Sequence, residues 1–168
     1  MRKVTSAIAN KLVKQYNEEL QRLYTDEAAS MEYTEVEGIK PVVPAYDICG
    51  TRAAIKELSE KIVAIKHAIN TFNCSHYLPA TNVTIDSALV RIAMLSKEKS
   101  RLEQMLKPNK KSIKTGFGVR SNQIEYAVLN YDVADARTAY DDVSRRLVDM
   151  QLQLDVINTT VAEVEIPD

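Results

Sequence analysis

The residues with the most reactive side chains are two cysteines and two histidines. Cys74 and His76 are separated by one serine, and Cys49 and His67 lie elsewhere in the chain. Metal sites and thiol nucleophiles usually place such residues at short fixed spacings, such as CxxC or HExxH, and neither motif occurs. We therefore expect Cys74 and His76 in a turn between helices, His67 facing solvent and both cysteines as buried, reduced thiols. No catalytic residue, metal or cofactor is predicted.

Two adjacent carboxylates, Asp141 and Asp142, are the next candidates for chemistry. Neighbouring side chains on a helix point about 100° apart, so these two do not form a shared acid–base site. Arg145 and Arg146 follow at the spacing of surface ion pairs, each worth about 0.2–0.5 kcal/mol. The pattern is typical of a solvated helix face.

The strongest candidate for binding is the basic loop, KPNKKSIKTGFGVR, at residues 107–120. Five cations and one aromatic side chain, Phe117, occur there without an acidic residue, a pattern suited to a phosphate backbone or an anionic membrane surface. The alternative is a solvated loop, or one that pairs with the acidic connection at residues 25–50. The five cations are Lys107, Lys110, Lys111, Lys114 and Arg120.

The overall composition gives no electrostatic pull toward an anionic partner. Among 168 residues, 22 Lys and Arg nearly balance 23 Asp and Glu, so such a partner needs a local patch. Apolar residues make up 45%, with four glycines and no tryptophan, which is typical of a regular, helix-rich chain. No continuous apolar stretch resembles a signal peptide or a membrane span, so we expect a cytoplasmic location.

Four segments have the apolar periodicity of amphipathic helices. Thr51, Thr84 and Asp132 are the expected N-caps of the last three, because their side-chain oxygens accept hydrogen bonds from the first helical amides. The predicted helices cover residues 3–28, 51–72, 84–106 and 132–163.

The predicted fold is mainly all-α. We expect four long heptad-patterned helices in one antiparallel bundle or coiled coil, forming a single helical domain over residues 1–168. Two long connections of opposite charge each contain a strand-like piece, at residues 33–48 and 122–130. We expect these two connections to meet in a small antiparallel β-ribbon.

The fourth helix carries a longer apolar stripe than its neighbours. It is expected to span roughly 48 Å, against about 33 Å for the second and third helices. An apolar stripe left in water is unfavourable by about 25 cal/mol per Å², so either the first helix or a second copy of the chain must cover it. The heptad pattern favours self-association. We assign the oligomer seam to Leu147, Met150, Leu154, Ile157 and Val161.

Four stretches, taken in order, resemble one known family. They are VTSAIANKLVKQYNEELQRL, AINTFN, TIDSALVRIAML and SNQIEYAVLNYDVADAR, at the start of the first helix, the end of the second, the start of the third and the entry to the fourth. This arrangement resembles the septicolysin-like proteins, small bacterial proteins of largely unassigned function. The resemblance implies a mostly helical fold and supplies no catalytic residue, while the haemolysin label behind the family name implies membrane activity.

The expected function is binding rather than catalysis. These patterns favour a helical binding or structural protein that associates with itself as a homo-oligomer. A protein partner is compatible with them, and they identify no small-molecule substrate. The alternative is a membrane-active, haemolysin-like or nucleic-acid-binding protein that works through the basic loop. A third reading is an enzyme whose site the sequence does not locate.

Overall fold

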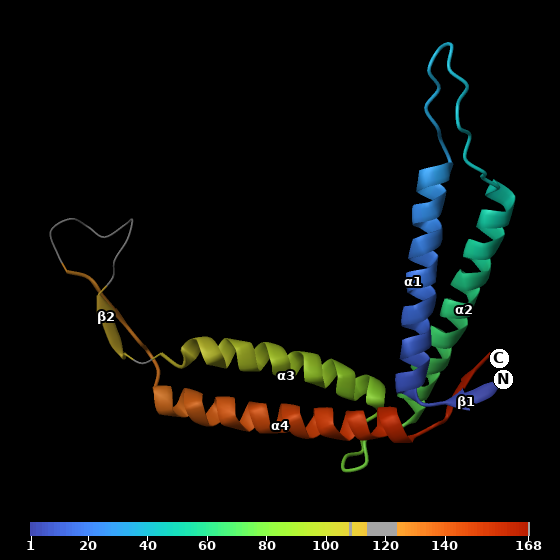
Figure 1. The fold of residues 1–168 in the computed structure, drawn as a ribbon. Helices are drawn as coiled ribbons and strands as arrows, with labels where there is room; N and C mark the ends of the chain where they lie inside the picture. The colour runs from blue at the N-terminus through green and yellow to red at the C-terminus, as the bar shows by residue number, and fades with distance from the viewer. Residues whose placement is uncertain (108, 114–123, 168) are drawn as a thin grey trace. The chain divides into compact units, whose positions relative to one another are not determined.

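The chain is mostly helical and contains two antiparallel strand pairs, which confirms the predicted mainly all-α fold (Figure 1). The structure, a computed structural model, describes residues 1–107, 109–113 and 124–167. The chain divides into two compact units, Met1–Tyr77 with Asp155–Asp168, and Leu78–Leu154. The elements are β1 (Arg2–Val4), α1 (Ser6–Ser30), α2 (Ile48–Ser75), α3 (Ile85–Met105), β2 (Lys111–Ile113), β3 (Tyr126–Val128), α4 (Val133–Thr160) and β4 (Val164–Ile166).

Two of the three predicted caps are confirmed. The side chain of Thr84 accepts a hydrogen bond from the Ser87 amide at 3.3 Å, and Asp132 Oδ1 accepts one from the Ala134 amide at 2.8 Å. Both caps satisfy amides that have no partner within the helix.

The predicted cap at Thr51 is wrong, because α2 begins earlier. Asp47 caps this helix and accepts a hydrogen bond from the Cys49 amide at 3.0 Å. Gly50 therefore lies inside the first turn of α2 rather than before it. A Cβ atom at Gly50 would come within 2.6 Å of Asp47 Oδ2, so the glycine leaves room for the capping carboxylate.

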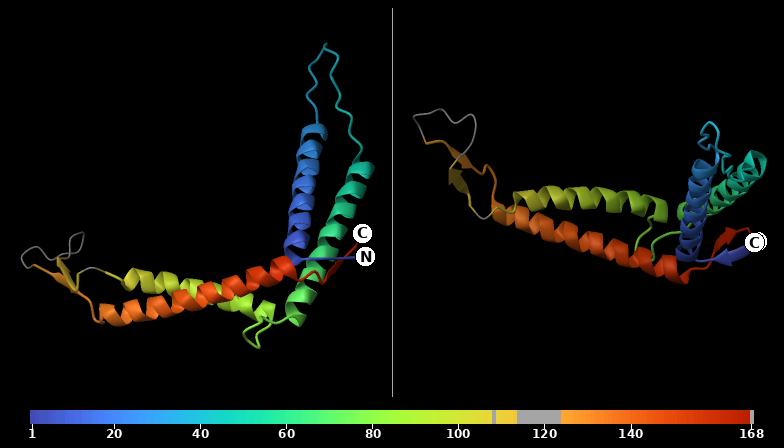
Figure 2. Two further views of the ribbon diagram at one scale, coloured as in Figure 1. Left: turned by 60° about the horizontal axis from the view of Figure 1, so that its bottom comes forward. Right: turned by 45° about the horizontal axis from the view of Figure 1, so that its top comes forward.

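In the first unit, α1 and α2 lie side by side in each view (Figures 1 and 2). From α1, Ala9 and Val13 are buried, and Thr5 caps the helix after the chain leaves β1. The heptad positions of α2 are buried as their spacing predicts. They are Leu58, Ile62, Ile65, Ile69 and Phe72.

The strand pair β1–β4 packs on the α1–α2 pair. Val4 lies opposite Val164, and Arg2 lies opposite Ile166. Val4, Val164 and Ile166 are buried, and β4 contacts both helices. This arrangement corrects the predicted end of the fourth helix, because α4 stops at Thr160 and Val164 reaches the core from a strand.

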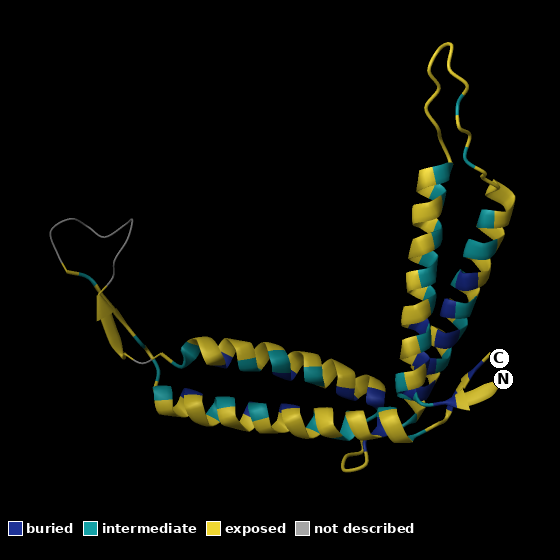
Figure 3. Ribbon diagram, viewed as in Figure 1, coloured by how far each residue is buried: buried dark blue, intermediate teal, exposed yellow. Residues whose placement is uncertain are grey.

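In the second unit, α3 and α4 lie side by side, with their buried residues on the facing sides (Figure 3). A small set of apolar side chains forms the core, and partly buried neighbours such as Ile92 and Tyr140 pack against it. The four buried residues of this core are Leu95, Leu102, Val143 and Leu147.

A small β-ribbon is present, but its strands differ from the prediction. β2 pairs with β3 in antiparallel register, Lys111 opposite Val128 and Ile113 opposite Tyr126, so both strands belong to the second connection. The strand expected at residues 33–48 is not formed; this region has a single bridge between Val36 and Ile39, around Gly38 with φ of 80°. The pairing of α3 with α4 brings the two ends of the second connection together. Pairing β2 with β3 within this one connection therefore costs less chain entropy than pairing strands from two separate connections.

Candidate functional site

The basic loop predicted from the sequence lies partly on the β2–β3 ribbon. Lys107, Lys110 and Lys111 are exposed, and the Lys111 ammonium lies 3.8 Å from the centre of the Tyr126 ring, a cation–π contact. Lys114 and Arg120 lie outside the described residues. Beyond the ribbon, the Tyr131 hydroxyl donates to the Met105 carbonyl oxygen at 2.8 Å, which connects the residues just before α4 to the end of α3.

The residues assigned to the oligomer seam are at least half-buried within a single chain. Leu147 is buried in the α3–α4 core, with Met150 partly buried beside it, and Ile157 is buried in the first unit. Leu154 and Val161 are half-buried. Contacts within the chain therefore cover much of this stripe.

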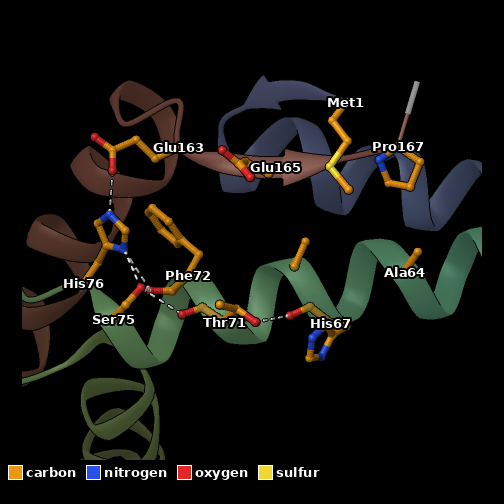
Figure 4. A pocket seen from close by; sticks show the side chains of 11 residues that line it. Met1, Ala64, His67, Thr71, Phe72, Ser75, His76, Glu163, Glu165 and Pro167 are labelled. Atoms are coloured by element: carbon orange, nitrogen blue, oxygen red, sulfur yellow. Dashed lines mark hydrogen bonds and ion pairs between the residues drawn. The ribbon is translucent and has the colours of Figure 1, made fainter.

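A cavity of about 400 Å³ lies between α2 and the β1–β4 segments of the first unit (Figure 4). Ala64, Ala68 and Phe72 of α2 give it an apolar wall, and Met1, Glu165 and Pro167 lie across from them. Its volume is within the range of small-molecule sites. The polar side chains that line it are His67, Thr71, Ser75, His76, Glu163 and Glu165.

His76 is the best-connected polar residue of this cavity. It caps the end of α2 and its ring stacks on Phe72, with 4.0 Å between ring centres. Its Nε2 lies 2.9 Å from Glu163 Oε2, and its Nδ1 lies 3.0 Å from both the Phe72 carbonyl oxygen and Ser75 Oγ. These contacts fix the imidazole and hold the segment that precedes β4 against α2 (Figure 4).

The Ser75–His76–Glu163 grouping has the residue types of a hydrolytic triad, but its hydrogen bonds are arranged differently. His76 Nδ1 lies 3.0 Å from the Phe72 carbonyl oxygen as well as from Ser75 Oγ, so Ser75 shares this ring nitrogen with a backbone carbonyl group. The Ser75 hydroxyl instead donates to the Thr71 carbonyl oxygen at 2.9 Å. These hydrogen bonds connect the Ser75 hydroxyl and the His76 ring to backbone carbonyl groups of α2.

The sequence did not reveal this cavity. His76 was expected in an ordinary turn, and Glu163 is 87 residues away from it, so no local spacing signals the contact. His67 is exposed, as expected. The expectation of buried thiols is wrong, because Cys49 and Cys74 both lie on α2 and are exposed.

A groove of about 490 Å³ runs between α3 and α4 in the second unit. Val90, Met94 and Met150 supply apolar surface. Two arginines, Arg91 and Arg146, and one carboxylate, Asp149, line the same groove.

Two exposed hydrogen bonds shift pKa values elsewhere in the first unit. The Tyr46 hydroxyl donates to Glu27 Oε1 at 2.7 Å, and this bond to a carboxylate raises the pKa of Tyr46 above its usual value. The Lys61 ammonium donates to Glu57 Oε1 at 2.6 Å, which lowers the pKa of Glu57 and raises that of Lys61. Both pairs lie on the surface.

Within the described ranges, no group of three or more His, Cys, Asp or Glu side chains is arranged to hold a metal ion. The helices in that part of the chain also lack the combination of length and hydropathy needed to cross a membrane.

No protein-family model and no curated protein matches this chain. Among solved structures, it is similar to a functionally unknown conserved protein from Corynebacterium diphtheriae, with a TM-score of 0.70 and 15% sequence identity. The match covers 97% of this chain and 99% of the other, so the two share a fold along their length. The resemblance to septicolysin-like proteins stays a prediction.

Proposed function

We propose that this chain is a non-catalytic binding or structural protein that works as a homo-oligomer, and that copies meet along an exposed apolar stripe of α4. The stripe consists of Val148, Leu152 and Val156, whose exposed fractions lie between 48% and 59%. Spacing of four residues places them in one row on the helix surface. This row is the observation that carries the proposal.

Helix α4 has two apolar faces. One face, with Val143 and Leu147, packs against α3. Single exposed apolar side chains are common on soluble proteins, but a row at helical spacing forms a ridge that fits the groove of another helix. Burial of that row in a second copy would remove its apolar area from water.

The proposed contact is the exposed stripe and not the oligomer seam, since Leu147 and Ile157 are already buried within the chain. We also propose a cytoplasmic location. The exposed free thiols of Cys49 and Cys74 support it, because a reducing compartment keeps such thiols from forming disulfides between copies.

Sedimentation velocity or light scattering tests the proposal. The expected mass is at least twice 18.9 kDa, and Leu152→Glu is expected to lower it because a carboxylate would be buried without a partner. Gln151→Glu is the matched control, since Gln151 is an exposed neighbour beside the stripe. Circular dichroism should give equal helicity for both variants.

A monomeric wild-type protein at high concentration would refute self-association. An oligomer whose mass is unchanged by Leu152→Glu would refute the stripe as its interface.

A further inference from the structure

The β2–β3 ribbon exposes several apolar side chains to solvent. All six strand residues are exposed, and Ile113, Ile124, Tyr126 and Val128 have exposed fractions from 47% to 69%. A two-stranded ribbon is marginally stable in water by itself. A surface that covers these side chains would stabilise it.

The same ribbon carries a local excess of positive charge. Lys107, Lys110 and Lys111 are exposed, and in the described part of the chain neither Lys107 nor Lys110 is paired with a carboxylate. Glu125 is the one acidic side chain among residues 106–107, 109–113 and 124–131. The charge of this surface is therefore complementary to an anionic partner.

From this combination we infer that the ribbon docks on the surface of an anionic lipid bilayer. The lysines contact the lipid phosphates, and the aliphatic side chains enter the boundary between headgroups and acyl chains. Tyr126 suits that boundary because its ring is apolar and its hydroxyl is polar. The ribbon lies on the membrane surface and does not cross it.

Nucleic acid fits these observations less well than lipid. A phosphate backbone would engage the lysines, and a base would stack on Tyr126. Ile113, Ile124 and Val128 would then stay in water, because aliphatic side chains gain little from a phosphate backbone. A bilayer surface uses both the charges and the aliphatic side chains.

Vesicle co-sedimentation of the full chain tests this inference. We expect binding to vesicles that contain phosphatidylglycerol and not to pure phosphatidylcholine, with affinity falling as salt rises. The triple variant Lys107→Glu, Lys110→Glu, Lys111→Glu should lose affinity by at least about 100-fold. The double variant Ile113→Ser, Val128→Ser should lose it by about 10-fold or more.

The matched control is Lys56→Glu, Lys66→Glu, Lys97→Glu, which changes the net charge equally at exposed helical positions. It should keep most of the affinity, and all variants should keep wild-type helicity. No vesicle binding by the wild-type protein, or equal losses in both triple variants, would overturn the inference. A third result would also overturn the inference. In it, the wild-type protein binds a single-stranded oligonucleotide but no vesicles, and the double variant Ile113→Ser, Val128→Ser binds the oligonucleotide equally well.

Discussion

The two strand pairs of this protein have the same backbone design and opposite surroundings. β1–β4 and β2–β3 are both antiparallel, with three residues in each strand. Val4, Val164 and Ile166 of the first pair are buried, whereas every side chain of the second pair is exposed. Strand pairing alone therefore does not decide whether the side chains of a short ribbon are buried. The apolar side chains of β1–β4 are buried because this pair packs against helices.

The two helix pairs differ in the same way. The α1–α2 pair has the β1–β4 pair packed on it, which adds buried side chains beyond those of the helices. The core of the α3–α4 pair comes from these two helices, with four buried residues at its centre. We expect substitutions of buried residues to lower the free energy of unfolding more in the first unit than in the second.

The largest expected effect is at Ile166, which is 1% exposed. Ile166→Ala should lower the free energy of unfolding by about 3–4 kcal/mol, because it removes buried methyl groups and leaves a cavity. Urea denaturation measures the change. The matched variant Val128→Ala, on the exposed ribbon, should change stability by less than about 0.5 kcal/mol. Similar losses for both variants would contradict the contrast between the ribbons.

A smaller effect is expected at Leu95 in the second unit. Leu95→Ala should cost about 2 kcal/mol, because Leu95 lines the α3–α4 groove and the space left behind opens partly to water. Amide hydrogen exchange should become faster in α3 and α4 and stay unchanged in the β1–β4 pair. Equal acceleration in both units would show that they open together.

The smallest effect is expected for the Lys61–Glu57 pair on the surface of α2. The Lys61 ammonium lowers the pKa of Glu57 in the folded chain below its ordinary value of 4.5. The pair therefore stabilises the fold at pH values above 4.5, and this contribution disappears as the pH falls through the lowered pKa. In Lys61→Met, an NMR titration should find the pKa of Glu57 closer to 4.5. An unchanged titration would mean that Lys61 does not set it.

Much of the helical structure could be predicted because its causes lie within a few residues. Leu58, Ile62 and Ile65 of α2 are buried at heptad spacing, and the caps at Thr84 and Asp132 follow from local hydrogen bonds. The predicted cap at Thr51 is wrong because Asp47 caps α2 one turn earlier, and Gly50 leaves room for the Asp47 carboxylate.

The candidate sites were predictable to different degrees. Charge excess is a local property, so the exposed lysines of the basic loop were identified from composition. The cavity around His76 depends on Glu163, and neither residue type nor spacing connects positions so distant in the chain. The exposed stripe of α4 was not identified from the sequence, because the oligomer seam was assigned to the residues with the strongest apolar periodicity. Part of that periodicity belongs to the core between α3 and α4.

The sequence alone determined the four helices, since apolar period and capping act over three or four neighbours. Tertiary structure decided whether the side chains of the strands are buried or exposed. Val164 and Val128 are the same residue type in short strands, yet one is buried and the other exposed. The physical reason is that burial depends on which helix face lies opposite, and that face comes from residues far away in the chain.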